Sequence, residues 1–91
     1  MNPNEKYDSL RTALDKHESW PIVYMFKFII PADNQKLALV TSKFSDDSII
    51  TKNESSNGKY LSITIKEVML DAESIINKYI EMEGIEGLMG L

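Results

Sequence analysis

The sequence predicts one α+β domain in which helices pack against an antiparallel sheet. Two segments rich in β-branched and aromatic residues, 22–30 and 60–66, predict strands. Asn57-Gly58 lies just before the second segment, and this dipeptide is a strong hairpin signal. Elsewhere, apolar residues recur at helical spacing. At 91 residues, 43% of them hydrophobic, the chain has room for a single core.

An N-terminal helix is predicted before the first strand, over residues 2–17. Asn2 and Glu5 have the spacing of a capping box at its start. A narrow apolar stripe follows at helical spacing, made of Tyr7, Leu10 and Leu14. Trp20-Pro21 ends the helical stretch, because the residue before a proline disfavours helical geometry.

The segment 22–30 predicts a central strand with two apolar faces. One face carries Ile22, Tyr24, Phe26, Phe28 and Ile30. The other carries Val23, Met25 and Ile29 beside Lys27. Because both faces are mainly apolar, we expect each of them to be covered, either by another part of the chain or by a second copy.

Two further helices are predicted from caps and apolar spacing. Asp33 can cap the first, whose apolar stripe consists of Leu37, Val40, Thr41 and Phe44. Asp71 can cap the second, whose apolar positions are Ile75, Ile76, Tyr79, Ile80 and Met82. Gly84 is a candidate stop for the second helix.

A β-hairpin is predicted between these two helices, with strands over residues 48–54 and 60–66. Asn57-Gly58 is expected to form a type I′ turn, which needs positive φ at both central residues. In the second strand, Leu61, Ile63 and Ile65 face one way, and Tyr60, Ser62, Thr64 and Lys66 face the other. A weak final strand is expected over residues 85–91.

The predicted elements follow the order helix, then β-α-β-β-α-β. Two right-handed βαβ units of this kind interleave into an antiparallel sheet of order 4-1-3-2 with both helices on one face, the ferredoxin-like sandwich. We therefore expect a helical extension over residues 1–18 and a single ferredoxin-like domain over residues 19–91. The N-terminal helix is expected to pack at least partly on the other face of the sheet, because it is already tethered. A second copy of the chain is the alternative cover.

Composition and charge argue against several classes of function. The chain has no cysteine, which removes disulfides and cysteine-based zinc sites and fits a cytoplasmic protein. A net charge of −4 with scattered basic residues disfavours nucleic acid and anionic membranes as partners. No secretory signal and no apolar stretch of about 20 residues is evident. We expect a partner protein or self-association, with a small-molecule ligand as an open alternative.

Three segments carry a resemblance to a known family. They are the Trp20-Pro21 junction, the strand Tyr24-Met25-Phe26-Lys27-Phe28 and the run Ser55-Ser56-Asn57-Gly58-Lys59-Tyr60-Leu61-Ser62-Ile63-Thr64. Over residues 20–91 the chain resembles the YbeD-like family, a set of small bacterial proteins of unknown function. The resemblance implies a ferredoxin-like sandwich similar to the ACT domains that regulate metabolic enzymes. It brings no reaction, cofactor or accepted functional residues.

No residue is predicted to be catalytic, to bind a cofactor or to hold a metal. His17 is the only histidine, and the sequence places no partner acid beside it. The acidic residues of the helix-to-strand loop and of the C-terminal region lack the spacing of a metal site. They are Asp46, Asp47, Glu81, Glu83 and Glu86.

The candidate interaction surface has two parts. The first, on the sheet face without helices, comprises Val23, Met25, Ile29 and Tyr60. The second, at the hairpin tip, comprises Ser55, Ser56 and Lys59, which resemble an anion loop but are more simply explained as a turn. Ser62 stands where an RNA-recognition strand would carry a second aromatic residue, so RNA binding is not expected.

These observations favour a non-catalytic regulatory or protein-interaction module. The alternative is an ACT-like domain that senses an amino acid, although the loop Pro31-Ala32-Asp33 lacks the glycine that such domains often place there. An enzyme of unidentified reaction ranks third, because no set of residues is arranged for catalysis.

Overall fold

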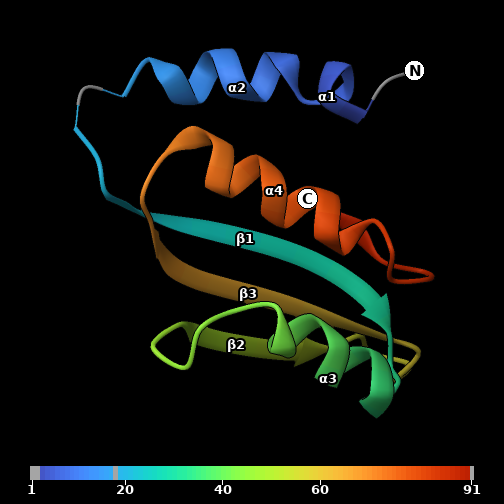
Figure 1. Ribbon diagram of the computed structural model, residues 1–91. Coiled ribbons are helices and arrows are strands. Elements are labelled where there is room, and N and C mark those ends of the chain that lie inside the picture. The colour runs from blue at the N-terminus through green and yellow to red at the C-terminus, as the bar shows by residue number, and fades with distance from the viewer. Residues whose placement is uncertain (1–2, 18, 91) are drawn as a thin grey trace.

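The computed structural model describes residues 3–17 and 19–90 and has an α+β architecture built on one four-stranded antiparallel sheet (Figure 1). The strands are β1 (Ile22–Pro31), β2 (Ile49–Glu54), β3 (Tyr60–Met69) and β4 (Met89–Gly90). The helices are α1 (Pro3–Lys6), α2 (Asp8–Asp15), α3 (Asn34–Ser42) and α4 (Ala72–Met82). The sheet order is β2-β3-β1-β4, which is the predicted order read from the opposite edge.

β1 and β3 form the centre of the sheet, and their alternation separates a buried face from an open one. Phe26 and Phe28 of β1 are completely buried, and so are Ile63 and Ile65 of β3. Phe26 lies opposite Ile65 and Phe28 opposite Ile63, so these four side chains form one continuous apolar layer. The predicted core face of both strands is confirmed.

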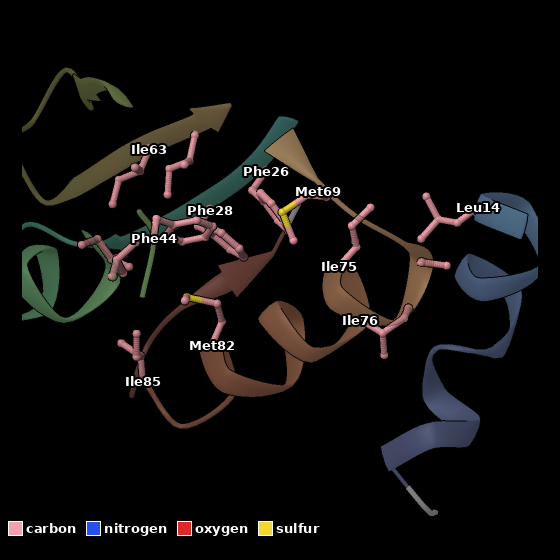
Figure 2. Close-up of a cluster of buried hydrophobic side chains, with 14 residues drawn as sticks. Leu14, Phe26, Phe28, Phe44, Ile63, Met69, Ile75, Ile76, Met82 and Ile85 are labelled. Carbon is pink, nitrogen blue, oxygen red and sulfur yellow. The ribbon is translucent and has the colours of Figure 1, made fainter. Parts of the chain in front are cut away.

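The helices that cover this face begin where the sequence predicts. The Asp33 carboxylate accepts a hydrogen bond from the backbone N–H of Gln35 at 2.7 Å. Asp71 caps α4 in the same way, and Ser74 completes a capping box with it. The buried side chains that α4 contributes to the core include Ile75, Ile76 and Met82 (Figure 2).

The N-terminal segment packs on α4, so the prediction that it covers the open face of the sheet is wrong. α2 runs beside α4 (Figure 1), and Leu14 is buried in the same core cluster as Ile75 and Ile76 of α4 (Figure 2). Tyr7 interrupts the predicted single helix and separates α1 from α2. The physical reason is that α4 is apolar over a wide arc and has a second side that the sheet does not bury. Asn2, predicted to cap the helix, lies outside the described residues.

The hairpin is at the predicted place, but its turn is not of type I′. The loop spans residues 56–59, because Ser55 N–H donates to the Tyr60 carbonyl at 2.9 Å. Gly58 N–H closes a turn onto the Ser55 carbonyl at 2.9 Å and has φ +73°. Asn57 does not have positive φ. A loop of four residues needs only one left-handed position, whereas the two-residue type I′ turn needs two.

The remaining differences lie towards the C-terminus. α4 ends at Met82 with Glu83 as its C-cap, so the predicted stop Gly84 directly follows the helix, but the positive φ of this region, +82°, belongs to Gly87. The weak final strand is shorter than predicted and consists of β4 alone. Leu91, which was included in that prediction, lies outside the described residues.

Candidate interaction surface

One face of the sheet is left uncovered by the helices, and we call it the open face. It consists of the residues that alternate with the core: Val23, Met25, Lys27 and Ile29 of β1, Ile49, Thr51 and Asn53 of β2, Tyr60, Ser62, Thr64, Lys66 and Val68 of β3, and Met89 of β4. Within the part of the chain that the structure describes, no element covers this face, so a second copy of the chain stays a prediction as its cover.

Four apolar side chains of the open face lie at the end where β1 begins. Val23 and Val68 are opposite one another and are 67% and 58% exposed. Ile49 is 65% exposed. Ile49 of β2 and Met25 of β1 both lie opposite Lys66 of β3, which stands between them. Exposed aliphatic residues are ordinary singly, but a group on neighbouring strands is typical of an interaction site. We call Val23, Met25, Ile49 and Val68 the apolar corner.

A groove of about 580 Å³ adjoins the apolar corner. β2 begins at Ile49, opposite Lys66, so residues 67–69 of β3 extend beyond it. The groove lies along this overhang, and Leu70 and Lys78 also contribute to its lining. Leu70 is 72% exposed, which extends the apolar surface past the end of the strand.

The other end of the open face is apolar as well. Ile29 is partly buried there, because β4 lies beside it and pairs Met89 with it, and Met89 itself is 53% exposed. Tyr60 lies on the open face and is 47% exposed. On this face it is the next residue of β3 after Ser62, which pairs with Ile29. The predicted surface residues of the strands therefore share one face, but they lie at its two ends.

The hairpin tip is held by its own hydrogen bonds. Ser55 Oγ donates to Asn57 Oδ1 at 2.9 Å and accepts from the Tyr60 N–H at 3.1 Å. Asn57 Oδ1 also accepts from the Lys59 N–H at 3.0 Å. These bonds engage the backbone donors that an anion loop would direct at its ligand. Ser56 and the Lys59 side chain are exposed at the tip.

A second hollow, of about 540 Å³, lies where the N-terminal helices meet α4 and β1. Three tyrosines from these elements line it. Tyr24 and Tyr79 share a hydrogen bond between their hydroxyl oxygens at 2.9 Å, and the Tyr7 ring stacks on that of Tyr79 at 5.9 Å. Tyr7 OH also donates to Glu83 Oε1 at 2.7 Å, and Lys6 Nζ donates to the same oxygen at 2.7 Å.

The surroundings of Tyr7 and Tyr79 keep these two phenols protonated. Burial, followed by the hydrogen bond to Glu83, raises the pKa of Tyr7 to about 12. Burial and the hydrogen bond with Tyr24 also raise the pKa of Tyr79. The hydrogen bonds from Lys6 and Tyr7 lower the pKa of Glu83. At neutral pH these phenols can donate hydrogen bonds but cannot act as bases.

The residue pattern of the sequence does not predict this hollow. Tyr7 and Tyr79 were assigned to apolar helical stripes and Tyr24 to the core, because helical and strand periodicity treat tyrosine as an apolar residue. No local pattern joins the three, since they come from three elements far apart in the chain. Only the packing of α2 on α4 brings them together.

The remaining polar candidates do not converge on a site. The His17 ring meets Trp20 edge-on at 6.0 Å between centroids. Within residues 3–17 and 19–90, no group of three or more histidine, aspartate or glutamate side chains could hold a metal ion. Glu83, one of the acids singled out in the sequence, is paired with Lys6.

No known protein family, no curated protein and no solved structure matches this chain. None of the helices in the described residues is both long enough and apolar enough to span a membrane.

Proposed function

We propose that this protein is a non-catalytic interaction module of the cytoplasm that binds a partner protein through the open face. The observation that supports the proposal is the apolar corner, where Val23, Ile49 and Val68 are each more than half exposed on adjacent strands. Val23 and Val68 belong neither to the buried core nor to the residues packed against it, so packing among the described residues does not require apolar side chains at these positions.

We propose further that the domain is ferredoxin-like and related to the YbeD-like proteins. The β2-β3-β1-β4 order with antiparallel pairing supports the first part. The run Ser55-Ser56-Asn57-Gly58-Lys59-Tyr60, which forms the hairpin, is the residue-level support for the second.

The test compares proteins captured from the source cells by three forms of the full chain. Val23→Gln/Val68→Gln makes the apolar corner polar without changing the net charge. Leu39→Gln is the matched control, because Leu39 is a 50% exposed aliphatic residue on α3. We expect a partner that binds the wild type and the control and is lost with the double variant. Identical captures by all three forms, with unchanged circular dichroism, would contradict the proposal.

The tyrosine hollow favours a second candidate, an ACT-like role in sensing an amino acid. In the Tyr24–Tyr79 pair one hydroxyl donates to the other, so the accepting phenol has a proton available for a ligand. A thermal-shift screen of the twenty amino acids would detect such binding, because a ligand of the folded state raises Tm. A shift that Tyr79→Phe abolishes would support this role, and no shift with any amino acid would exclude it.

A further inference from the structure

The open face is positively charged, although the protein as a whole is acidic. Lys27 and Lys66 project from it on the neighbouring strands β1 and β3. Lys27 lies opposite Thr64 and Lys66 lies opposite Met25, so the lysines are diagonal neighbours across the strand pair. Both are exposed, and neither forms an ion pair with any residue that the structure describes.

The carboxylates of the sheet point the other way. The acidic residues within the strands are Glu54 and Glu67. Glu54 pairs with Leu61, and Glu67 pairs with Tyr24, so both alternate onto the face that carries the helices. Glu67 is engaged there, since its carboxylate accepts the Ser45 N–H at 2.6 Å. In a chain of net charge −4, the strands therefore present lysines and no carboxylate on the open face, while Asp47, in the loop before β2, lines the adjoining groove together with Lys66.

We infer that the partner segment that docks on the open face is itself acidic and apolar, with carboxylates that pair with Lys27 and Lys66 and aliphatic side chains that cover the apolar corner. The inference rests on the proposed function, that the open face binds a protein, and specifies the chemistry of that protein. Charge complementarity supports this inference. Two lysines that form no ion pair lie beside exposed aliphatic residues, and a segment that alternates carboxylate and apolar side chains would match both features. Such pairs act mainly through specificity and association rate.

A second copy of the chain does not satisfy this surface. Stacking two open faces would bring the lysines of both copies together with no carboxylate from either face between them. Like charges brought together in an interface oppose association. An RNA strand would satisfy the lysines, but Tyr60 is the single aromatic residue on the open face, and single-strand binders rely on several stacking rings.

The experiment selects ligands for the full-length protein from a random peptide library displayed on phage. Enriched peptides are synthesised, and their affinities are measured by fluorescence anisotropy at low and at physiological salt. We expect acidic peptides with interspersed aliphatic residues. Lys27→Glu/Lys66→Glu should weaken them by about tenfold or more at low salt, and by less as salt screens the charges. Lys16→Glu/Lys52→Glu is the matched control, because both lysines are exposed, Lys52 faces the helix side of the sheet, and the charge change is equal.

A charge-swapped peptide adds a positive readout that loss of folding cannot mimic. Peptides whose carboxylates are replaced by lysine should bind Lys27→Glu/Lys66→Glu more tightly than the wild type. Binding that depends on Val23 and Val68 but not on the lysines would overturn the inference and leave the proposed function standing. Peptides insensitive to both double variants would overturn both.

Two parallel measurements test the other candidate partners of the open face, a second copy of the chain and RNA. Sedimentation velocity of the protein alone reports self-association, and a dimer lost in Val23→Gln/Val68→Gln would overturn the inference. Anisotropy of a labelled single-stranded RNA of mixed sequence reports nucleic acid. The inference would also be overturned if RNA binding required Lys27 and Lys66 while no acidic peptide bound in a way that requires them.

Discussion

Shortening Leu14 to alanine tests where the N-terminal helix packs. Leu14 is 4% exposed and belongs to the core cluster that includes Ile75 and Ile76. Leu→Ala changes in a core cost about 2–5 kcal/mol, with the smaller values where the site can relax. Because α2 lies at the margin of the molecule and can relax towards α4, we expect a loss of about 2–3 kcal/mol. A domain of this size has a free energy of unfolding of about 5–14 kcal/mol, so the loss is readily measured.

Urea unfolding followed by the fluorescence of Trp20, the only tryptophan, measures this loss. With an m value of about 1–2 kcal/mol per molar urea, the midpoint should fall by about 1–3 M. Val23→Thr is the control, because Val23 is 67% exposed and threonine keeps the β-branch. Its effect should stay within about 0.5 kcal/mol. If the control cost as much as Leu14→Ala, or Leu14→Ala cost nothing, the placement of α2 on α4 would be refuted.

Two further predictions concern alkaline pH and the glycines near the C-terminus. The pKa of Tyr7 rises on folding from 10.0 to about 12, so its stabilising contribution is fully present below pH 10 and is lost as the pH rises through 12. Tyr7→Phe should therefore reduce the alkaline loss of stability measured by urea unfolding, and an unchanged pH profile would contradict this assignment. Gly87→Ala should cost about 1–3 kcal/mol, because φ is +82° and the new Cβ would lie 2.9 Å from a proline ring carbon. Gly90→Ala, where nothing lies within 4 Å, should change the thermal unfolding midpoint little, and equal effects of the two changes would contradict the argument.

The strands were predictable because the alternation of apolar and polar residues is visible in the local sequence and places successive side chains on opposite faces of a strand. Once residues 22–30 and 60–66 were assigned as strands, side-chain period two determined which residues share a face. The structure confirms this for Phe26 and Phe28 on the buried face and for Val23 and Met25 on the open face. The caps Asp33 and Asp71 were predictable for the same reason, since a cap bonds to backbone only a few residues away.

The tyrosine hollow and the place of the N-terminal helix were not predictable in this way. The stripe of Tyr7, Leu10 and Leu14 fits any apolar surface of suitable width, and the molecule offers at least two. α4 prevails over the sheet, because Tyr79 stacks with Tyr7 and Glu73 pairs with Arg11, contacts that the open face with its lysines does not offer.

The sequence by itself therefore determined the α+β class, the strand order, the core face and the residues of the open face, because each follows from periodicity and local caps. Tertiary structure decided that no helix among the described residues covers the open face and that Lys27 and Lys66 are neighbours on it. The net charge of the chain does not reveal this basic face, because Glu54 and Glu67 are on the same strands as the open-face residues and differ from them only in the side to which they point. Local alternation separates the two sets of charges, whereas pairing register, a long-range property, makes the two lysines diagonal neighbours.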